Sequence, residues 1–385
     1  MQNSESRIQN SEAVVVTGIG LLSCLGNLQE TWDGLLAGKS GIELSQPFAE
    51  LPAYPLGLID RTPIFLEDIT QLVVSAALQD ANLSTPLPDC GVVIGSSRGC
   101  QGNWERLATQ IKDIPPDNWL NTLPDRGAVA TATYLGTIAP VLAPMAACAT
   151  GIWAIARAYE LIATGQCQRA IAGAVEAPIT KLSLAGFERM GALATTGCYP
   201  FDRSREGLVL GEGGAILVLE TASAARQRQA RVYGRILGFG LTCDAHHISS
   251  PDSQSSTGAI AIKQCLTRSN LKPDEIDYIH AHGTGTALND RHEAGLIKYL
   301  FSPEIAVSST KGATGHTLGA SGAIGTALSL MAMEQGYLPP CIGLRNTEFP
   351  LNFVTQSRRD KKINHAMCFS FGFGGQNAVL AIGKC

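Results

Sequence analysis

Cys148 is the residue of this chain whose surroundings best suit nucleophilic chemistry. It lies in the run Ala143-Pro-Met-Ala-Ala-Cys-Ala-Thr-Gly151, directly before residues 152–164, where apolar side chains recur at helical spacing. A thiol at a helix N-terminus faces unpaired N–H groups and the positive end of the helix dipole, which favour the thiolate. The flanking alanines leave room for an acyl group. The pattern predicts a nucleophile that attacks a carbonyl carbon.

A buried structural role is the alternative for Cys148, because the chain carries 11 cysteines. Two histidines favour the catalytic interpretation. His282 lies in His280-Ala-His-Gly-Thr-Gly-Thr286, and His316 ends Ser308-Ser-Thr-Lys-Gly-Ala-Thr-Gly-His316. Each follows a predicted strand, residues 277–281 and 305–309, and the second loop leads into a predicted helix over residues 317–335. Loops after strands are where α/β proteins carry functional groups.

Other residues of these motifs have two interpretations each. Lys311 either supports the site electrostatically or is a surface lysine. Phe373, between two glycines, is either a ring that moves beside the site or a packing aromatic. Asp290 and Glu293 are predicted to cap the N-terminal N–H groups of the helix that follows His282, and thus to be structural.

Composition excludes several classes of function. A chain of 385 residues with 45% hydrophobic and 16% charged residues suits two parts that share a buried core. The net charge of -4 and the lack of a Lys/Arg block argue against nucleic-acid binding. Cysteines without Cys-x-x-Cys spacing predict reduced thiols and no metal site. The polar residues 1–12 do not resemble a secretory signal, so we expect them to be disordered and the protein to be cytoplasmic.

An internal repeat predicts the architecture. Gly211–Leu219 resembles Gly372–Leu380, and each is a glycine-rich turn that leads into a strand. Upstream of each lies a reactive residue before a helix rich in small residues, so we expect two similar halves, residues 13–225 and 231–385. Small residues within 317–335 indicate close packing inside the protein and not a membrane span. Continuous apolar strands at 13–17, 91–95 and 169–173 predict an α/β fold whose sheets are covered on both faces.

These motifs together resemble a known family. The segments Ala147-Cys-Ala-Thr-Gly151, His282-Gly-Thr-Gly-Thr286, Ser309-Thr-Lys-Gly-Ala-Thr-Gly-His316 and Phe369-Ser-Phe-Gly-Phe-Gly-Gly-Gln-Asn377 are similar to those of the elongating β-ketoacyl-acyl carrier protein synthases of the thiolase superfamily, in the same order. The match runs from about Val14 to Ile382. It implies a thiolase-like five-layer α-β-α-β-α fold of two duplicated halves, with the active site between them, and a homodimer.

The resemblance also implies a reaction, that of a 3-oxoacyl-[acyl carrier protein] synthase. Cys148 would take an acyl chain from an acyl carrier protein while the N–H groups of Cys148 and Phe373 hold the oxyanion, and Phe373 would gate access. Malonyl-acyl carrier protein would then lose carbon dioxide. His282 and His316, as neutral donors, would hold the enolate, and Lys311 would assist; we expect the charged form of His316 to be disfavoured by a helix N-terminus. Substrates arrive on the carrier's phosphopantetheine, so no bound cofactor or metal is expected.

Two departures from the family pattern leave alternatives open. Gly325 stands where elongating synthases usually carry a glutamate, as in polyketide ketosynthases. A ketosynthase of a polyketide or specialised lipid pathway is therefore an alternative to fatty-acid elongation, and a non-elongating partner subunit is another, which Cys148 argues against. Residues 48–69 are poor in lysine, so we assign the carrier contact to Arg203 and Arg205. The alternative is that these arginines hold the turn at 207–214.

Overall fold

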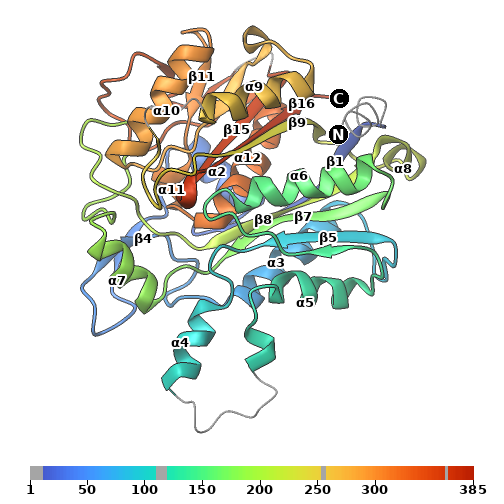
Figure 1. Cartoon of the computed structure of the whole chain (residues 1–385), viewed down its shortest axis with the longest axis horizontal. Coiled ribbons are helices and arrows are strands. Elements are labelled where there is room, and N and C mark those ends of the chain that lie inside the picture. The colour runs from blue at the N-terminus through green and yellow to red at the C-terminus, as the bar shows by residue number, and fades with distance from the viewer. Residues whose placement is uncertain (1–11, 110–118, 253–256, 360–362) are drawn as a thin grey trace.

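The chain forms two halves with the same strand order, as the computed structural model shows for residues 12–109, 119–252, 257–359 and 363–385 (Figure 1). The expected disorder of the opening segment concerns residues outside these ranges, apart from Glu12. The strands of the first half are β1 (Val14–Ser23), β2 (Gly26–Asn27), β3 (Glu43–Ser45), β4 (Tyr54–Leu56), β5 (Cys90–Gly95), β6 (Val141–Leu142), β7 (Arg169–Glu176) and β8 (Gly213–Thr221). Those of the second half are β9 (Gly234–Cys243), β10 (Tyr278–His280), β11 (Ala306–Ser308), β12 (Tyr337–Leu338), β13 (Asn352–Phe353), β14 (Arg358–Arg359), β15 (His365–Gly372) and β16 (Gln376–Gly383).

Helices follow the strands in both halves. The first half has α2 (Leu28–Leu36), α3 (Leu66–Asp80), α4 (Gln101–Thr109), α5 (Arg126–Leu135), α6 (Thr150–Ala163), α7 (Lys181–Arg189) and α8 (Ala222–Gln227), with a 3-10 turn at Trp119–Thr122. The second has α9 (Thr257–Ser269), α10 (Ala287–Leu300), α11 (Lys311–Thr314) and α12 (Ser321–Gln335), with 3-10 turns at Pro273–Glu275, Leu318–Ala320 and Phe373–Gly375. The predicted helices over 152–164 and 317–335 are therefore α6 and, after a 3-10 turn, α12.

Strand pairing reveals the duplication. In the first half the order is β6-β5-β7-β8-β1, with β6, β5 and β7 parallel and β7, β8 and β1 antiparallel. The second half repeats it as β11-β10-β15-β16-β9, with β13 added beside β11. A short antiparallel ladder pairs Val14–Val16 of β1 with Gly234–Ile236 of β9 and joins the two sheets. The boundaries 13–225 and 231–385 stay a prediction.

Five layers result from this arrangement. Helices α3 and α5 cover the outer face of the first sheet, α9 and α10 lie over the second, and α6 and α12 fill the space between the sheets (Figure 1). The predicted thiolase-like α-β-α-β-α architecture is confirmed. Among the described helices, none has the length and apolar character needed to cross a bilayer.

Two glycines let the central helices approach closely. A Cβ on Gly151 of α6 would lie 2.6 Å from the backbone nitrogen of Ala323, and a Cβ on Gly322 of α12 would lie 2.8 Å from Cγ1 of Ile152. Each glycine is the second residue of its helix and meets the third residue of the other. The contact is therefore symmetric about the axis that relates the halves, and it brings the two helix starts together.

Candidate active site

Cys148 lies at a strained turn two residues before α6. Ala147 has a φ of 47°, which is uncommon for a residue with a side chain. Thr150 holds the turn, because its Oγ1 accepts from the N–H of Ala146 at 2.9 Å and donates to the carbonyl of Ala147 at 2.7 Å. The Ser370 hydroxyl of β15 donates to the Cys148 carbonyl at 2.8 Å. The predicted position at a helix N-terminus is therefore observed.

His282 is fixed through its backbone. It follows β10, and the carboxylate of Glu293 accepts from the N–H groups of His282 at 2.6 Å and Gly283 at 2.7 Å. Asp290 similarly accepts from Thr284 at 3.0 Å and from Phe201 at 2.7 Å. The prediction that Asp290 and Glu293 cap α10 was wrong. They bond to the loop that carries His282, because their side chains point back from the first turns of α10 toward it.

His316 is held between two turns. Its N–H donates to the Val209 carbonyl at 2.6 Å, and its carbonyl accepts from Gly211 at 3.1 Å. Its Nδ1 lies 2.9 Å from the Ser321 hydroxyl at the start of α12. A hydroxyl donating to Nδ1 leaves the proton of the neutral ring on Nε2. Sequence reasoning missed Ser321.

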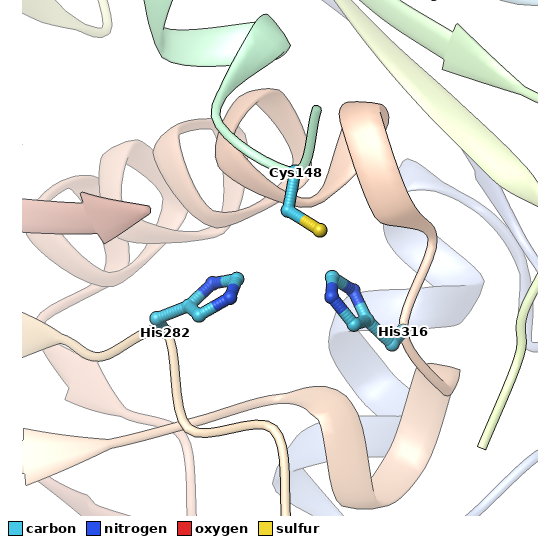
Figure 2. A group of neighbouring side chains, drawn as sticks. All are labelled: Cys148, His282 and His316. Carbon is cyan, nitrogen blue, oxygen red and sulfur yellow. The ribbon is translucent and has the colours of Figure 1, made fainter. Parts of the chain in front are cut away.

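The three predicted groups converge. The sulfur of Cys148 and one ring nitrogen of each of His282 and His316 lie within 4.8 Å of one another. The two imidazoles meet edge to face, with centroids 5.2 Å apart. Figure 2 shows the sulfur pointing toward the space between the two rings. A cavity of about 400 Å³ opens onto all three residues and onto Phe373.

Lys311 is buried within this site, so its interpretation as a surface lysine was wrong. Only 3% of the residue is exposed. Its ammonium donates to the His282 carbonyl and lies 3.5 Å from Nδ1 of the same residue. Since an ammonium can only donate, Nδ1 of His282 faces a donor and the proton of the ring lies on Nε2.

Burial dominates the electrostatics of the site. Desolvation, with the charge of Lys311 as a smaller cause, holds the pKa values of His282 and His316 well below their usual range, so both rings are neutral. We expected a helix dipole to disfavour the charged form of His316. The causes found are burial and the charge of Lys311. Burial also raises the pKa of Cys148 to about 11, although the Lys311 charge and the N–H of Phe373 lower it. The predicted preference for thiolate therefore does not hold in the free protein.

Two family models match the chain. The Beta-ketoacyl synthase, N-terminal domain, matches residues 60–225, and the Beta-ketoacyl synthase, C-terminal domain, matches residues 233–345. The chain belongs to the beta-ketoacyl synthase family. It is therefore an acyltransferase of the condensing type. The predicted resemblance is confirmed.

Relatives of this beta-ketoacyl synthase match over nearly their whole length. The 3-oxoacyl-[acyl-carrier-protein] synthase 2 of Coxiella burnetii is 35% identical over 96% of this chain and 98% of its own, and that of Staphylococcus aureus is 34% identical over 98% and 99%. The ishigamide ketosynthase/chain length factor structure matches with a TM-score of 0.90 and 28% identity, over 98% of this chain and 100% of its own. A type II polyketide ketosynthase, bound to a hexaketide and in complex with its acyl-carrier protein, matches with 0.91 and 27%, over the same shares.

Phe373 lies next to the nucleophile of this synthase. Its N–H faces the sulfur and lowers the pKa of Cys148. Its ring lies 6.2 Å from that of Phe187, and both rings line the cavity. A Cβ on Gly372 would lie 2.9 Å from the carbonyl oxygen of Ala146 and 3.1 Å from the Cys148 nitrogen, so glycine favours this close approach of the turn to Cys148.

The two arginines assigned to carrier binding differ. The Arg205 side chain is 5% exposed, pairs with Glu348 at 2.7 Å, donates to the Asp202 carbonyl at 2.8 Å and lies over the ring of Phe349. These contacts give Arg205 a structural role, but none of them is to the turn at 207–214 named in the alternative. Arg203 is exposed.

Sequence reasoning also missed Glu176, a fully buried carboxylate at the end of β7. It accepts hydrogen bonds from the Ser96 and Ser97 hydroxyls and from the N–H groups of Ser97, Arg98 and Gly319, at 2.6 to 3.0 Å. It thus connects the loop after β5 to the turn after His316. A charged residue that ends an otherwise apolar strand was the available signal.

Cys148, His282 and His316 together have the donor types of a zinc site, one sulfur and two imidazoles. The buried ammonium of Lys311 beside His282 disfavours a second cation there. The expectation that this synthase needs no metal and no bound cofactor stays a prediction.

Proposed function

We propose that the chain condenses acyl and malonyl thioesters on an acyl carrier protein, as a 3-oxoacyl-[acyl carrier protein] synthase of fatty-acid elongation. The observation that carries this proposal is the buried cluster of Cys148 with two neutral imidazoles, all within 4.8 Å. A cysteine hydrolase needs one histidine. Two neutral donors beside one thiol suit a reaction that must also hold an enolate.

In the first half-reaction the Cys148 sulfur attacks the thioester carbonyl carbon. Because its pKa lies near 11, the thiol must lose its proton as it attacks. Both imidazoles already carry a proton on Nε2, so the thiol proton passes to the sulfur of the departing carrier. The N–H groups of Cys148 and Phe373 hold the oxyanion. The bond to the carrier's sulfur then breaks, and that thiolate takes up the proton.

In the second half-reaction the malonyl group loses carbon dioxide. The electron pair of the broken C–C bond forms an enolate, whose oxygen accepts from Nε2–H of His282 and His316. Neutral imidazoles stabilise this charge without transferring a proton to the carbon. The enolate carbon attacks the acyl-Cys148 carbonyl and the C–S bond breaks. The Cys148 thiolate then takes up a proton from solvent, and the 3-oxoacyl product leaves on its carrier.

The acyl chain has an apolar region to occupy. Ile179, Leu184, Phe187, Leu208 and Leu318 form one packed cluster with Cys148. Ile179 also lines a second cavity of about 300 Å³ beyond α7, bounded by Phe48 and Phe65. We place the chain along this cluster.

Fatty-acid elongation is the preferred pathway because the relatives at 34–35% identity are named 3-oxoacyl-[acyl-carrier-protein] synthase 2, whereas the type II polyketide ketosynthase matches at 27%. The polyketide alternative rests on that structure and on Gly325.

Carrier and partner contacts follow from exposed groups. We assign carrier docking to Arg203. A second arginine, Arg291, lies in the same region, since both it and Arg203 lower the pKa of Glu348, after the larger effect of Arg205. A second copy of the chain is proposed along β6. That edge strand and its neighbours expose Ile138 (88%), Val141 (38%), Leu142 (39%) and Met145 (57%), an apolar edge of the kind that pairs with another chain.

Mass spectrometry of the protein after incubation with a panel of acyl carriers tests the proposal. We expect the acyl mass on Cys148, and His282→Ala or His316→Ala should lower release of labelled carbon dioxide from malonyl carrier on the order of a hundredfold. Acylation should persist in both variants. An acyl group on another cysteine, or normal decarboxylation in both variants, would contradict it.

A further inference from the structure

A third histidine, His280, is buried near the catalytic groups and has no part in the reaction proposed above. It ends β10, and only 3% of it is exposed. Its Nε2 lies 3.2 Å from the hydroxyl of Thr310. Burial, with the charge of Lys311 as a second cause, lowers its pKa to about 3, so the ring is neutral.

The ring of His280 occupies the space above Gly325. A Cβ at residue 325 would lie 2.6 Å from Nδ1 and 2.7 Å from Cε1 of His280. Glycine weakens a helix interior, and Gly325 has no left-handed backbone that would require it. The close approach of the ring is therefore the reason for glycine at this position, and the two residues form one unit.

Thr310 connects this unit to Lys311. It precedes the short helix α11, yet its side chain does not cap that helix. Its hydroxyl faces His280 instead, while its carbonyl accepts from the N–H groups of Ala313 and Thr314. The next residue, Lys311, reaches the carbonyl and Nδ1 of His282. A continuous series of contacts thus runs from the ring of His280 to that of His282.

We propose that His280 is a positioning residue that, through Thr310, holds Lys311 against His282. A lysine displaced from Nδ1 would no longer favour the ring form that carries its proton on Nε2, which is the donor for the enolate. The ring of His280 also leaves no room for a longer side chain at residue 325. The kinetic part of this inference rests on the proposed function, and the steric part does not.

Thermal unfolding of Gly325→Ala, His280→Ala and the double variant tests the steric part. Gly325→Ala alone should lower Tm by a few degrees, because its Cβ displaces the ring. In the His280→Ala background the same substitution should cost nothing or raise Tm, since alanine favours the helix. Additive losses in the double variant would overturn the pairing. This cycle stands even if the chain proves to have another activity.

The kinetic test compares the two half-reactions in His280→Ala and Thr310→Val. We expect release of carbon dioxide from malonyl carrier to fall about tenfold to a hundredfold, while acylation of Cys148 stays within about twofold. Tyr278→Phe is the matched control, because it removes a buried hydroxyl contact with Ser308, at 2.7 Å, on the same strand and face. Equal losses in both half-reactions, or none, would overturn the positioning role.

Discussion

The turn before α6 and the turn before α12 occupy equivalent places in the two halves, yet only the first carries a nucleophile. Ala147 and Leu318 both have positive φ, 47° and 39°, and each lies three residues before the first residue of its helix. The next residue is Cys148 in one turn and Gly319 in the other. The duplication thus pairs the nucleophile with a glycine.

The surroundings of the two turns explain the difference. A Cβ on Gly319 would lie 2.6 Å from the carboxylate of Glu176 and 2.9 Å from the Ser97 nitrogen, so that place is already filled. Beside Cys148 the equivalent space opens into the cavity with His282 and His316. The same turn with a positive φ therefore positions a nucleophile in one half and a packed glycine in the other.

The glycine-rich turns show the same contrast across the halves. Gly372 of the second half packs on Cys148. Gly211 of the first half packs on Gly315, next to His316, since a Cβ on Gly211 would lie 3.2 Å from Cα of Gly315. The residue after each differs: Phe373 points its N–H at the sulfur, whereas the carboxylate of Glu212 accepts from Ile59 and Ile64. Each half supports the reactive loop of the other.

The largest effect is expected when the nucleophile is removed from the first turn. Cys148→Ala should reduce condensation at least about a thousandfold, because no other thiol lies beside the two imidazoles among the described residues. Adding Gly319→Cys to Cys148→Ala should not restore acylation, since Glu176 and Ser97 fill that position. Mass spectrometry after incubation with acyl carrier checks both, and an acylated residue 319 would contradict the contrast.

The symmetric helix contact predicts a similar cost on either side. Gly151→Val and Gly322→Val should each lower the free energy of unfolding by about 3 kcal/mol, because the added methyls meet the facing helix. Gly186→Ala in α7 is the control, since a Cβ there meets nothing within 4 Å. Urea titration measures all three. A large loss in one helix alone would mean that the contact is not symmetric.

Glu212, the counterpart of Phe373, should make stability depend on pH. Burial raises its pKa from 4.5 to about 7, so its contribution is fully present below pH 4.5 and is lost as the pH rises through 7. Between pH 4.5 and pH 8 the free energy of unfolding of Glu212→Gln should therefore fall by about 3 kcal/mol less than that of the parent. Glu293 also has a raised pKa, but it is present in both the parent and the variant, so its contribution cancels in the difference between them. Parallel pH profiles for the two would contradict the prediction.

The smallest effect concerns the charge of Lys311, which acts on Cys148 in the first turn. Lys311 lowers the pKa of Cys148, so Lys311→Ala should raise that pKa and slow alkylation of the thiol by iodoacetamide at pH 8, by less than about tenfold. Lys181→Ala, which removes an exposed lysine, is the control. Faster alkylation of the Lys311 variant would show that burial, and not charge, controls the reactivity.

Much of the fold and site followed from local sequence. The strands at 13–17, 91–95 and 169–173, the helices after Cys148 and His316, and the repeat at Gly211 and Gly372 are patterns within short windows. The burial of Lys311, the fit of His280 over Gly325 and the donors to Glu176 depend on segments up to 143 residues apart, as for Glu176 and Gly319. The pKa of Cys148 was misjudged for the same reason, because local dipoles are visible in sequence and desolvation is not.

The β1–β9 ladder that joins the two sheets bears on how such a site could arise. Val14–Val16 and Gly234–Ile236 pair strands that hold equivalent places in the two halves, as a dimer of identical half-length chains would pair. In such a dimer every substitution occurs twice, so a cysteine at one turn forces a cysteine at the other. Once a single gene encodes both halves, mutation and selection act on each turn separately, and an asymmetric centre can evolve within a symmetric scaffold.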